Sequence, residues 1–119
     1  MSLVDDLHAE IGDSLRALST YHEDEYELVY ERADVSTKPR AIDRIHQELI
    51  MEEMGTEYLE DVFDVGRLNC TMHCFEEAMC FHFVRGPMRG VFVAVDPDAI
   101  LPMQRFVAVC SESGVDSSL

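Results

Sequence analysis

Residues 67–95, RLNCTMHCFEEAMCFHFVRGPMRGVFVAV, decide the fold of this chain. They contain three alternating apolar runs, which are separated by two turn signals at Phe75–Ala78 and Arg85–Pro87. Alternation with a period of two residues is typical of strands, and short turns bring consecutive strands side by side. The stretch therefore predicts an antiparallel meander of three strands, which forms the core of a sheet.

The rest of the chain predicts one more strand and several helices. Tyr26, Leu28 and Tyr30 alternate with Glu25, Glu27, Val29 and Glu31, which predicts an edge strand over 25–31 whose charged outer face discourages pairing with other sheets. Apolar residues with helical spacing predict helices over 3–19, 40–54, 56–63 and 99–111. This order predicts an α+β domain with a four-stranded antiparallel sheet, the meander plus one edge strand, packed by three to four helices.

The length and the apolar pattern also bound the organisation of the chain. Its 119 residues suffice for one core, so we expect a single domain over 1–112. The small polar residues 113–119 predict a flexible C-terminal tail. We see no signal peptide and no apolar run of about 18 residues, so we expect a cytoplasmic protein without a membrane partner.

The charge of the protein is strongly negative, with 24 acidic and 9 basic residues and a net charge of -15. A field of this sign repels phosphate backbones, so nucleic acid is excluded as a direct ligand. The acids are spread along the chain, and Lys38 is the one lysine. Dispersed acids with little lysine suit a halophilic, archaeal protein, because salt near 1 M screens charges beyond about 3 Å. An ordinary acidic protein is the alternative interpretation.

The meander also gathers histidines and cysteines that are candidate metal ligands. A two-residue turn at Glu76–Glu77 places His73 opposite Cys80 on the neighbouring strand. The same register places His82 opposite Thr71 on that face. Neighbours of this kind lie about 5 Å apart, so His73, Cys80 and His82 are candidate ligands of a metal ion. Their spacing matches no common zinc pattern, and hydrogen-bonded packing under a helix is the alternative, which we favour.

Other chemistry finds little support in the sequence. There is no Gly-rich nucleotide loop, and activation of a cysteine needs a low pKa, which the net acidity opposes. Asp96-Pro97-Asp98 lacks the spacing of a calcium loop. Arg85–Gly90 is the one local basic spot and can hold an anion, although a hairpin turn already explains its glycines and proline. We therefore assign no catalytic residue and no cofactor beyond the candidate metal ion.

Glu57–Phe63, Cys70, Phe75–Ala78 and Phe81–Phe83 together resemble a family of small haloarchaeal proteins of uncharacterised function. The order of elements is also similar to that of roadblock and profilin-like domains. That resemblance implies a central antiparallel sheet between helices in a protein that is often dimeric and serves regulation and small-GTPase signalling. It supplies no catalytic residue.

These observations favour a non-enzymatic interaction or regulatory module that acts as a homodimer, with a protein partner. The last strand of the meander, Val91–Val95, is apolar on both faces and needs cover from helices or from a second subunit. A metal- or redox-responsive protein that uses His73, Cys80 and His82 is the first alternative. A small enzyme of unknown reaction is the second.

Metal analysis separates the two interpretations of the histidine and cysteine cluster. Hydrogen-bonded packing predicts that protein purified without a chelator carries no stoichiometric metal, whereas a metal site predicts about one equivalent per chain. Elemental analysis measures this directly. A full equivalent that disappears in a His82→Ala variant would contradict packing and establish the metal site.

Overall fold

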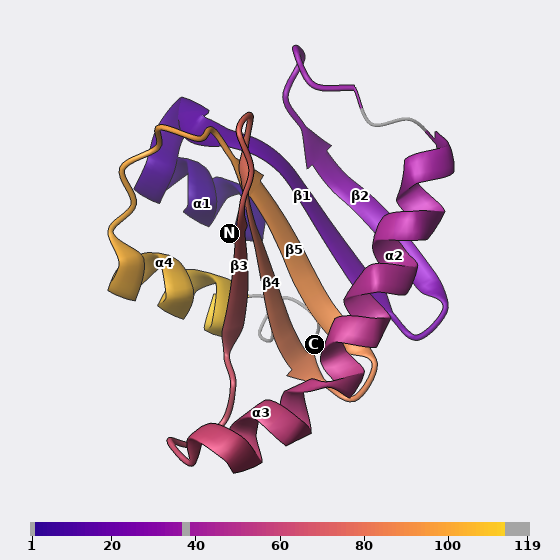
Figure 1. Ribbon diagram of the computed structural model, residues 1–119. Helices are drawn as coiled ribbons and strands as arrows, with labels where there is room; N and C mark the ends of the chain where they lie inside the picture. Colours follow the sequence, from indigo (N-terminus) through magenta and orange to yellow (C-terminus); the bar gives the residue numbers. More distant parts are fainter. Residues whose placement is uncertain (1, 37–38, 114–119) are drawn as a thin grey trace.

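The computed structural model describes residues 2–36 and 39–113, which form a five-stranded antiparallel sheet with helices on both faces (Figure 1). The strand order is β2-β1-β5-β4-β3. The strands are β1 (Leu15–His22), β2 (Glu25–Glu31), β3 (Cys70–Cys74), β4 (Met79–Gly86) and β5 (Arg89–Val95). The helices are α1 (Leu3–Ile11), α2 (Pro39–Met54), α3 (Thr56–Phe63) and α4 (Met103–Ala108). A 3-10 turn, Gly12–Ser14, follows α1, and a π-helical turn, Val109–Ser113, continues α4.

The prediction of four strands is wrong, because residues 15–22, of which 15–19 were expected to end the first helix, form strand β1 inside the sheet. Helix α1 ends at Ile11 and is capped by Gly12, whose positive φ of 60° glycine adopts without strain. Strand β1 then pairs with β2 on one side and β5 on the other. Leu15 and Leu18 fit a helical stripe as well as a strand with an irregular register, so these two pairings decide the structure.

The meander is confirmed, including its register. His73 pairs with Cys80 and Thr71 pairs with His82, as the two-residue turn at Glu76–Glu77 requires. The backbone N–H of Phe75 closes that turn by donating to the carbonyl of Ala78. The predicted edge strand 25–31 and the helices at 40–54 and 56–63 are also present, within one residue of their predicted bounds. Of the expected tail, Ser113 belongs to the helical end of the domain, and 114–119 lie outside the described residues.

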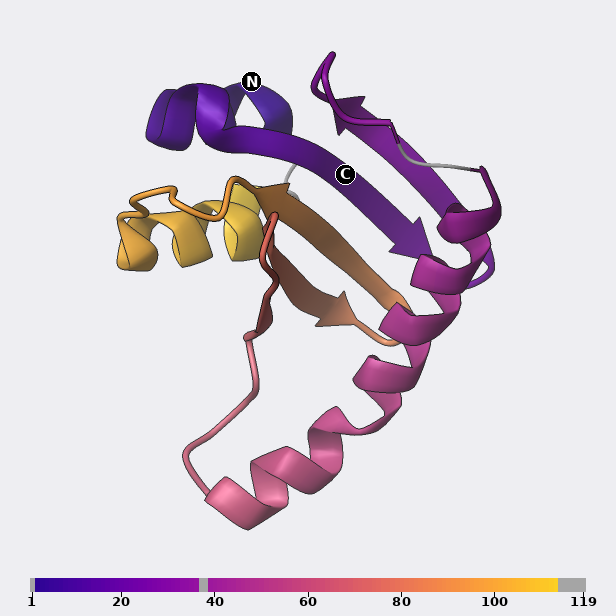
Figure 2. The same cartoon turned by 45° about the horizontal axis from the view of Figure 1, so that its top comes forward.

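Helices α1 and α4 lie on one face of the sheet and α2 lies on the other (Figure 2), and the side chains of the two faces differ in chemistry. The face under α1 and α4 is apolar, and Phe106 of α4 packs edge-on against Phe81 and Phe83, with ring centroids 4.8 and 5.8 Å away. The buried residues of this core are Leu3, Leu7, Leu15, Leu18, Phe81, Phe83, Val91, Val93, Val95, Phe106 and Cys110. The opposite face lies under α2 and buries the polar residues Ser19 and His82. Leu49 is the one buried residue within 41–54 of α2, so apolar packing holds this helix only weakly.

Gly90 is the position on β5 at which the sheet tolerates no side chain. A Cβ there would lie 2.5 Å from the carbonyl oxygen of Phe83 and 2.7 Å from the hydroxyl of Tyr21. Gly90→Ala should therefore lower the free energy of unfolding by about 1–3 kcal/mol, because backbone and a buried ring have to move. Urea denaturation measures the change.

Gly55→Ala, between α2 and α3, is the matched control, because its added Cβ meets only the carbonyl oxygen of Glu52, at 3.6 Å. Equal stability changes in the two variants would contradict the crowding at Gly90.

Candidate functional site

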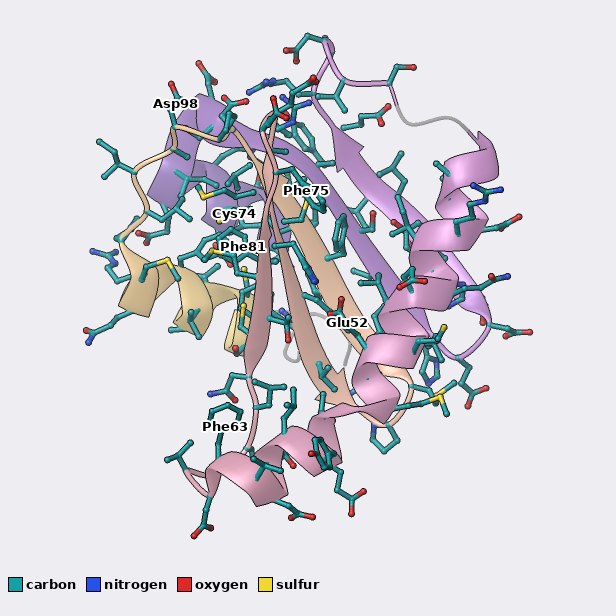
Figure 3. The ribbon with its side chains drawn as sticks, viewed as in Figure 1. Glu52, Phe63, Cys74, Phe75, Phe81 and Asp98 are labelled. Carbon is teal, nitrogen blue, oxygen red and sulfur yellow. The ribbon has the colours of Figure 1, made fainter. Side chains whose placement is uncertain are left out.

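A chain of polar side chains fastens α2 to the sheet, and we call it the α2 cluster: Tyr21, Glu52, Glu53, His73 and His82. His82 on β4 is 3% exposed, and its Nδ1 lies 2.8 Å from Oε1 of Glu52. Its Nε2 lies 2.8 Å from the hydroxyl oxygen of Tyr21. The Tyr21 hydroxyl in turn donates to Oε1 of Glu53 over 2.8 Å. Figure 3 shows Glu52 on α2 between the helix and the sheet.

The donors and acceptors of this chain determine where its protons lie. A carboxylate only accepts, so Nδ1 of His82 must donate to Glu52. The hydroxyl of Tyr21 donates its single proton to Glu53 and also contacts Nε2 of His82. The three bonds thus form a continuous network from Glu52 through His82 and Tyr21 to Glu53.

The outer contacts of the cluster extend it across the sheet. Oε2 of Glu53 accepts the backbone N–H of Met88 in the β4–β5 turn. Nε2 of His73 on β3 lies 3.5 Å from Oε2 of Glu52. Burial, and then the hydrogen bond to Glu53, raise the pKa of Tyr21 far above its ordinary value, so its hydroxyl keeps its proton. Two adjacent glutamates of α2 thus connect β1, β3, β4 and a turn.

The structure brings two of the three predicted metal ligands to the same carboxylate. His73 and His82 both contact Glu52, and Cys80 stands opposite His73 on the same face. Burial raises the pKa of Cys80, which keeps its thiol protonated and disfavours it as a thiolate ligand. Within 2–36 and 39–113, no group of three or more His, Cys, Asp or Glu side chains is placed to hold a metal ion. The metal role of the three residues stays a prediction.

Sequence reasoning missed Tyr21, Glu52 and Glu53 as members of the cluster. Tyr21 lies between the predicted helix 3–19 and the predicted strand 25–31, so no element was expected there, although it belongs to β1. The two glutamates follow the buried Leu49 by three and four positions, so they share its face of α2. That spacing is the signal in the sequence which points to their inward orientation.

The remaining cysteines give no sign of nucleophilic chemistry. All four are free thiols. Burial raises the pKa of Cys70 and of Cys110 to about 12, so neither ionises near neutral pH. Cys74, at the end of β3, is exposed.

Asp96, which begins the loop considered as a calcium motif, is already paired. Its carboxylate accepts from Arg32 at 2.8 and 2.9 Å and from Arg16 at 3.4 Å. The hydrogen bond from Arg32 is the main reason that the pKa of Asp96 is lowered. Two arginines thus occupy the oxygens of Asp96 that a cation would need.

Apart from this cluster, the surface has a second notable feature at the outer strand β3. No residue of Cys70–Cys74 carries a formal charge with its histidine neutral, and Met72 at its centre is 49% exposed. Helix α3, which precedes this strand, has no buried residue and projects away from the sheet (Figure 2). Exposed apolar side chains on and beside α3 and β3 are Met54, Tyr58, Leu59, Val62, Phe63, Val65, Met72 and Phe75. We call these residues, with β3, the β3 edge surface.

The arrangement of strands and helices places the protein in the roadblock-like class of α+β folds. The solved structure of MglC from Myxococcus xanthus is similar to it, with a TM-score of 0.52 and 13% sequence identity over 100% of both chains. At this identity the likeness shows the fold alone. The expected roadblock-like topology is confirmed, with the fifth strand supplied by residues 15–22.

The chain belongs to the family described as a domain of unknown function (DUF7522), whose model matches residues 1–113. None of the curated proteins that were compared matches the chain. Within the part of the chain that the structure describes, no helix is both long and apolar enough to cross a membrane.

The Tyr21 hydroxyl is the central link of the α2 cluster. Tyr21→Phe should lower the free energy of unfolding by about 1–3 kcal/mol, because His82 and Glu53 each lose a buried hydrogen bond. Tyr58→Phe, on the 70% exposed ring of α3, is the control and should change stability by less than about 0.5 kcal/mol. Chemical denaturation measures both, and equal effects would show that the bonds of Tyr21 contribute nothing.

Proposed function

We propose that the protein is a non-enzymatic interaction module that forms a homodimer, in which two copies pair through their β3 edge surfaces. The observation that carries the proposal is an uncharged, outermost strand flanked by exposed apolar side chains. The roadblock-like fold supports it, since this class is often dimeric. The proposal rests on three features of the described residues, which are the edge strand, its apolar neighbours and the contrast with the other edge.

The first feature is the open edge itself. Strand β3 hydrogen-bonds to β4 on one side only, so the backbone groups on its other side are free to pair with another strand. Proteins usually block such an edge with charged residues, proline or a covering segment. Cys70–Cys74 carries no acidic residue, lysine, arginine or proline, in a chain where 28% of the residues are charged. This edge is therefore chemically open to a second strand.

The second feature is the contrast with the opposite edge. Strand β2 carries Glu25, Glu27 and Glu31, so two copies of β2 would bring like charges together. Pairing between β2 of one copy and β3 of another would leave an open edge at each end of the pair and lead to chains of molecules. Pairing of β3 with β3 is isologous and closes after two copies. The distribution of charge thus favours a dimer over an open assembly.

The third feature is the apolar surface beside β3. Phe63 is 66% exposed and lies near the beginning of the strand, whereas Phe75 is 62% exposed and follows its end (Figure 3). Exposed apolar side chains that cluster on a surface usually mark an interaction site. Antiparallel pairing would bring the surface of each copy, including α3, against that of the other. The apolar side chains thereby supply the free energy that edge hydrogen bonds alone do not give.

A charged residue placed at the centre of β3 tests the dimer. Met72→Lys should raise the dissociation constant of the dimer at least ~10-fold, because two lysines would meet at the pairing centre without partners. Val29→Lys is the matched control, since Val29 is 42% exposed on the other edge strand, against 49% for Met72. Light scattering after size-exclusion chromatography measures the mass over a range of concentrations.

The proposal predicts a wild-type dimer, a monomeric Met72→Lys variant and a dimeric Val29→Lys variant. Because each copy carries a net charge of -15, the dimer should also tighten as salt is raised. A wild-type protein that remains monomeric in low and in molar salt would contradict the proposal. So would a dimer that Val29→Lys dissociates and Met72→Lys does not.

A further inference from the structure

A pocket of about 690 Å³ lies at the end of the sheet, beside the first residues of α1. It is on the face of the sheet opposite α2, because Arg85 follows the core residue Phe83 by two positions on β4, and Arg89 precedes Val91 by two positions on β5. The pocket is lined by both arginines together with Leu3, Leu18, Thr20 and Val91. It is thus a hollow of mixed apolar and polar lining with two cations at one side.

Arg85 is the unexplained residue of this pocket. Its Nε and Nη2 atoms are shielded from solvent and have no hydrogen-bond partner among the described residues. A guanidinium group has five N–H donors, and burying them unpaired costs free energy. Burial lowers the pKa of Arg85, and the charge of Arg89 lowers it further. The charged form of Arg85 therefore gains stability from any anion that reaches these nitrogens.

Arg89 adds a second cation without an acidic partner. Among the other described arginines, Arg16, Arg32 and Arg105 each pair with a carboxylate, whereas Arg44 and Arg67 are exposed to solvent and form no ion pair with the described residues. Neither Arg85 nor Arg89 forms an ion pair within 2–36 and 39–113, although the protein has 24 acidic residues. The acids that line the pocket, Glu25 and Glu27, belong to the exposed strand β2 and leave both guanidinium groups unpaired. This side of the pocket therefore keeps its positive charge.

We propose that Arg85 and Arg89 bind an oxyanion, the phosphate or carboxylate group of a ligand, in this pocket. Guanidinium groups match such oxygens through paired N–H donors, which gives both charge and direction. The apolar residues Leu3, Leu18 and Val91 would contact the remainder of the ligand. The hairpin turn explains Gly86 and Pro87, but it gives no reason for two unpaired arginines. The site is independent of the proposed dimer, because it lies away from the β3 edge surface.

Two different ligands would offer Arg85 and Arg89 the same oxyanion chemistry. One is a separate molecule, and the other is a carboxylate from 114–119 of the chain, which include Asp116. Calorimetric titration at fixed ionic strength, with inorganic phosphate and with acetate as probes, tests the site in the full chain and in a variant that ends at Ser113. Similar binding by both chains identifies a separate ligand, whereas binding only by the shortened chain identifies the carboxylate of the chain itself.

Arg85→Gln and Arg89→Gln should each weaken saturable binding at least ~10-fold, because each removes one guanidinium from the oxyanion. Arg89→Gln serves as the second test in case Arg85→Gln does not fold, since Arg89 lies beside the turn. Arg44→Gln, on an exposed position of α2, is the control and should bind as wild type. The proposal is overturned if neither the full nor the shortened chain shows saturable binding, or if Arg44→Gln weakens binding as much as the pocket variants.

Discussion

The buried hydrogen-bond chain from Glu52 through His82 and Tyr21 to Glu53 is the interaction on which the placement of α2 depends. Within 41–54 this helix buries only Leu49, so its apolar contacts with the sheet are few. Hydrogen bonds among glutamate, histidine and tyrosine side chains hold the helix instead. His46 adds a hydrogen bond from α2 to the backbone carbonyl of Glu23. Such bonds have strict geometry, so they fix where the helix lies more sharply than apolar packing alone does.

The two faces of the sheet differ in how they are packed, and its two edges differ in how they are protected. The apolar face under α1 and α4 supplies most of the core, whereas the face under α2 carries the polar chain. Strand β2 protects one edge with glutamates, and β3 leaves the other open. Because α2 leads directly into α3 and then to β3, the hydrogen bonds of Glu52 and Glu53 also set where the projecting α3 and the β3 edge surface lie. The hydrogen bonds that place α2 therefore also influence the position of the proposed interface.

Much of the fold could be predicted from the sequence because the local residue patterns agree with the tertiary strand pairing along most of the chain. The meander, its register and the edge strand 25–31 followed from alternation and from one short turn. The prediction for residues 15–22 was wrong because Leu15 and Leu18 are compatible with a helical stripe, and only pairing with β2 and β5 makes this segment a strand. Of the α2 cluster, His73 and His82 were found from the register of the meander. Their carboxylate partners were not, because α2 and β4 meet only in the folded chain.

The sequence by itself determined the α+β class of the domain and the register of its meander, since these depend on neighbours in the chain. It also determined the strong negative charge, which composition alone sets. The tertiary structure decided which charges are paired. It places Glu52 against two histidines and Asp96 against two arginines, and among residues 2–36 and 39–113 it gives Arg85 and Arg89 no acidic partner. Those pairings join residues 21 to 80 positions apart, and because electrostatic energy falls with distance in space, separation along the chain does not predict them.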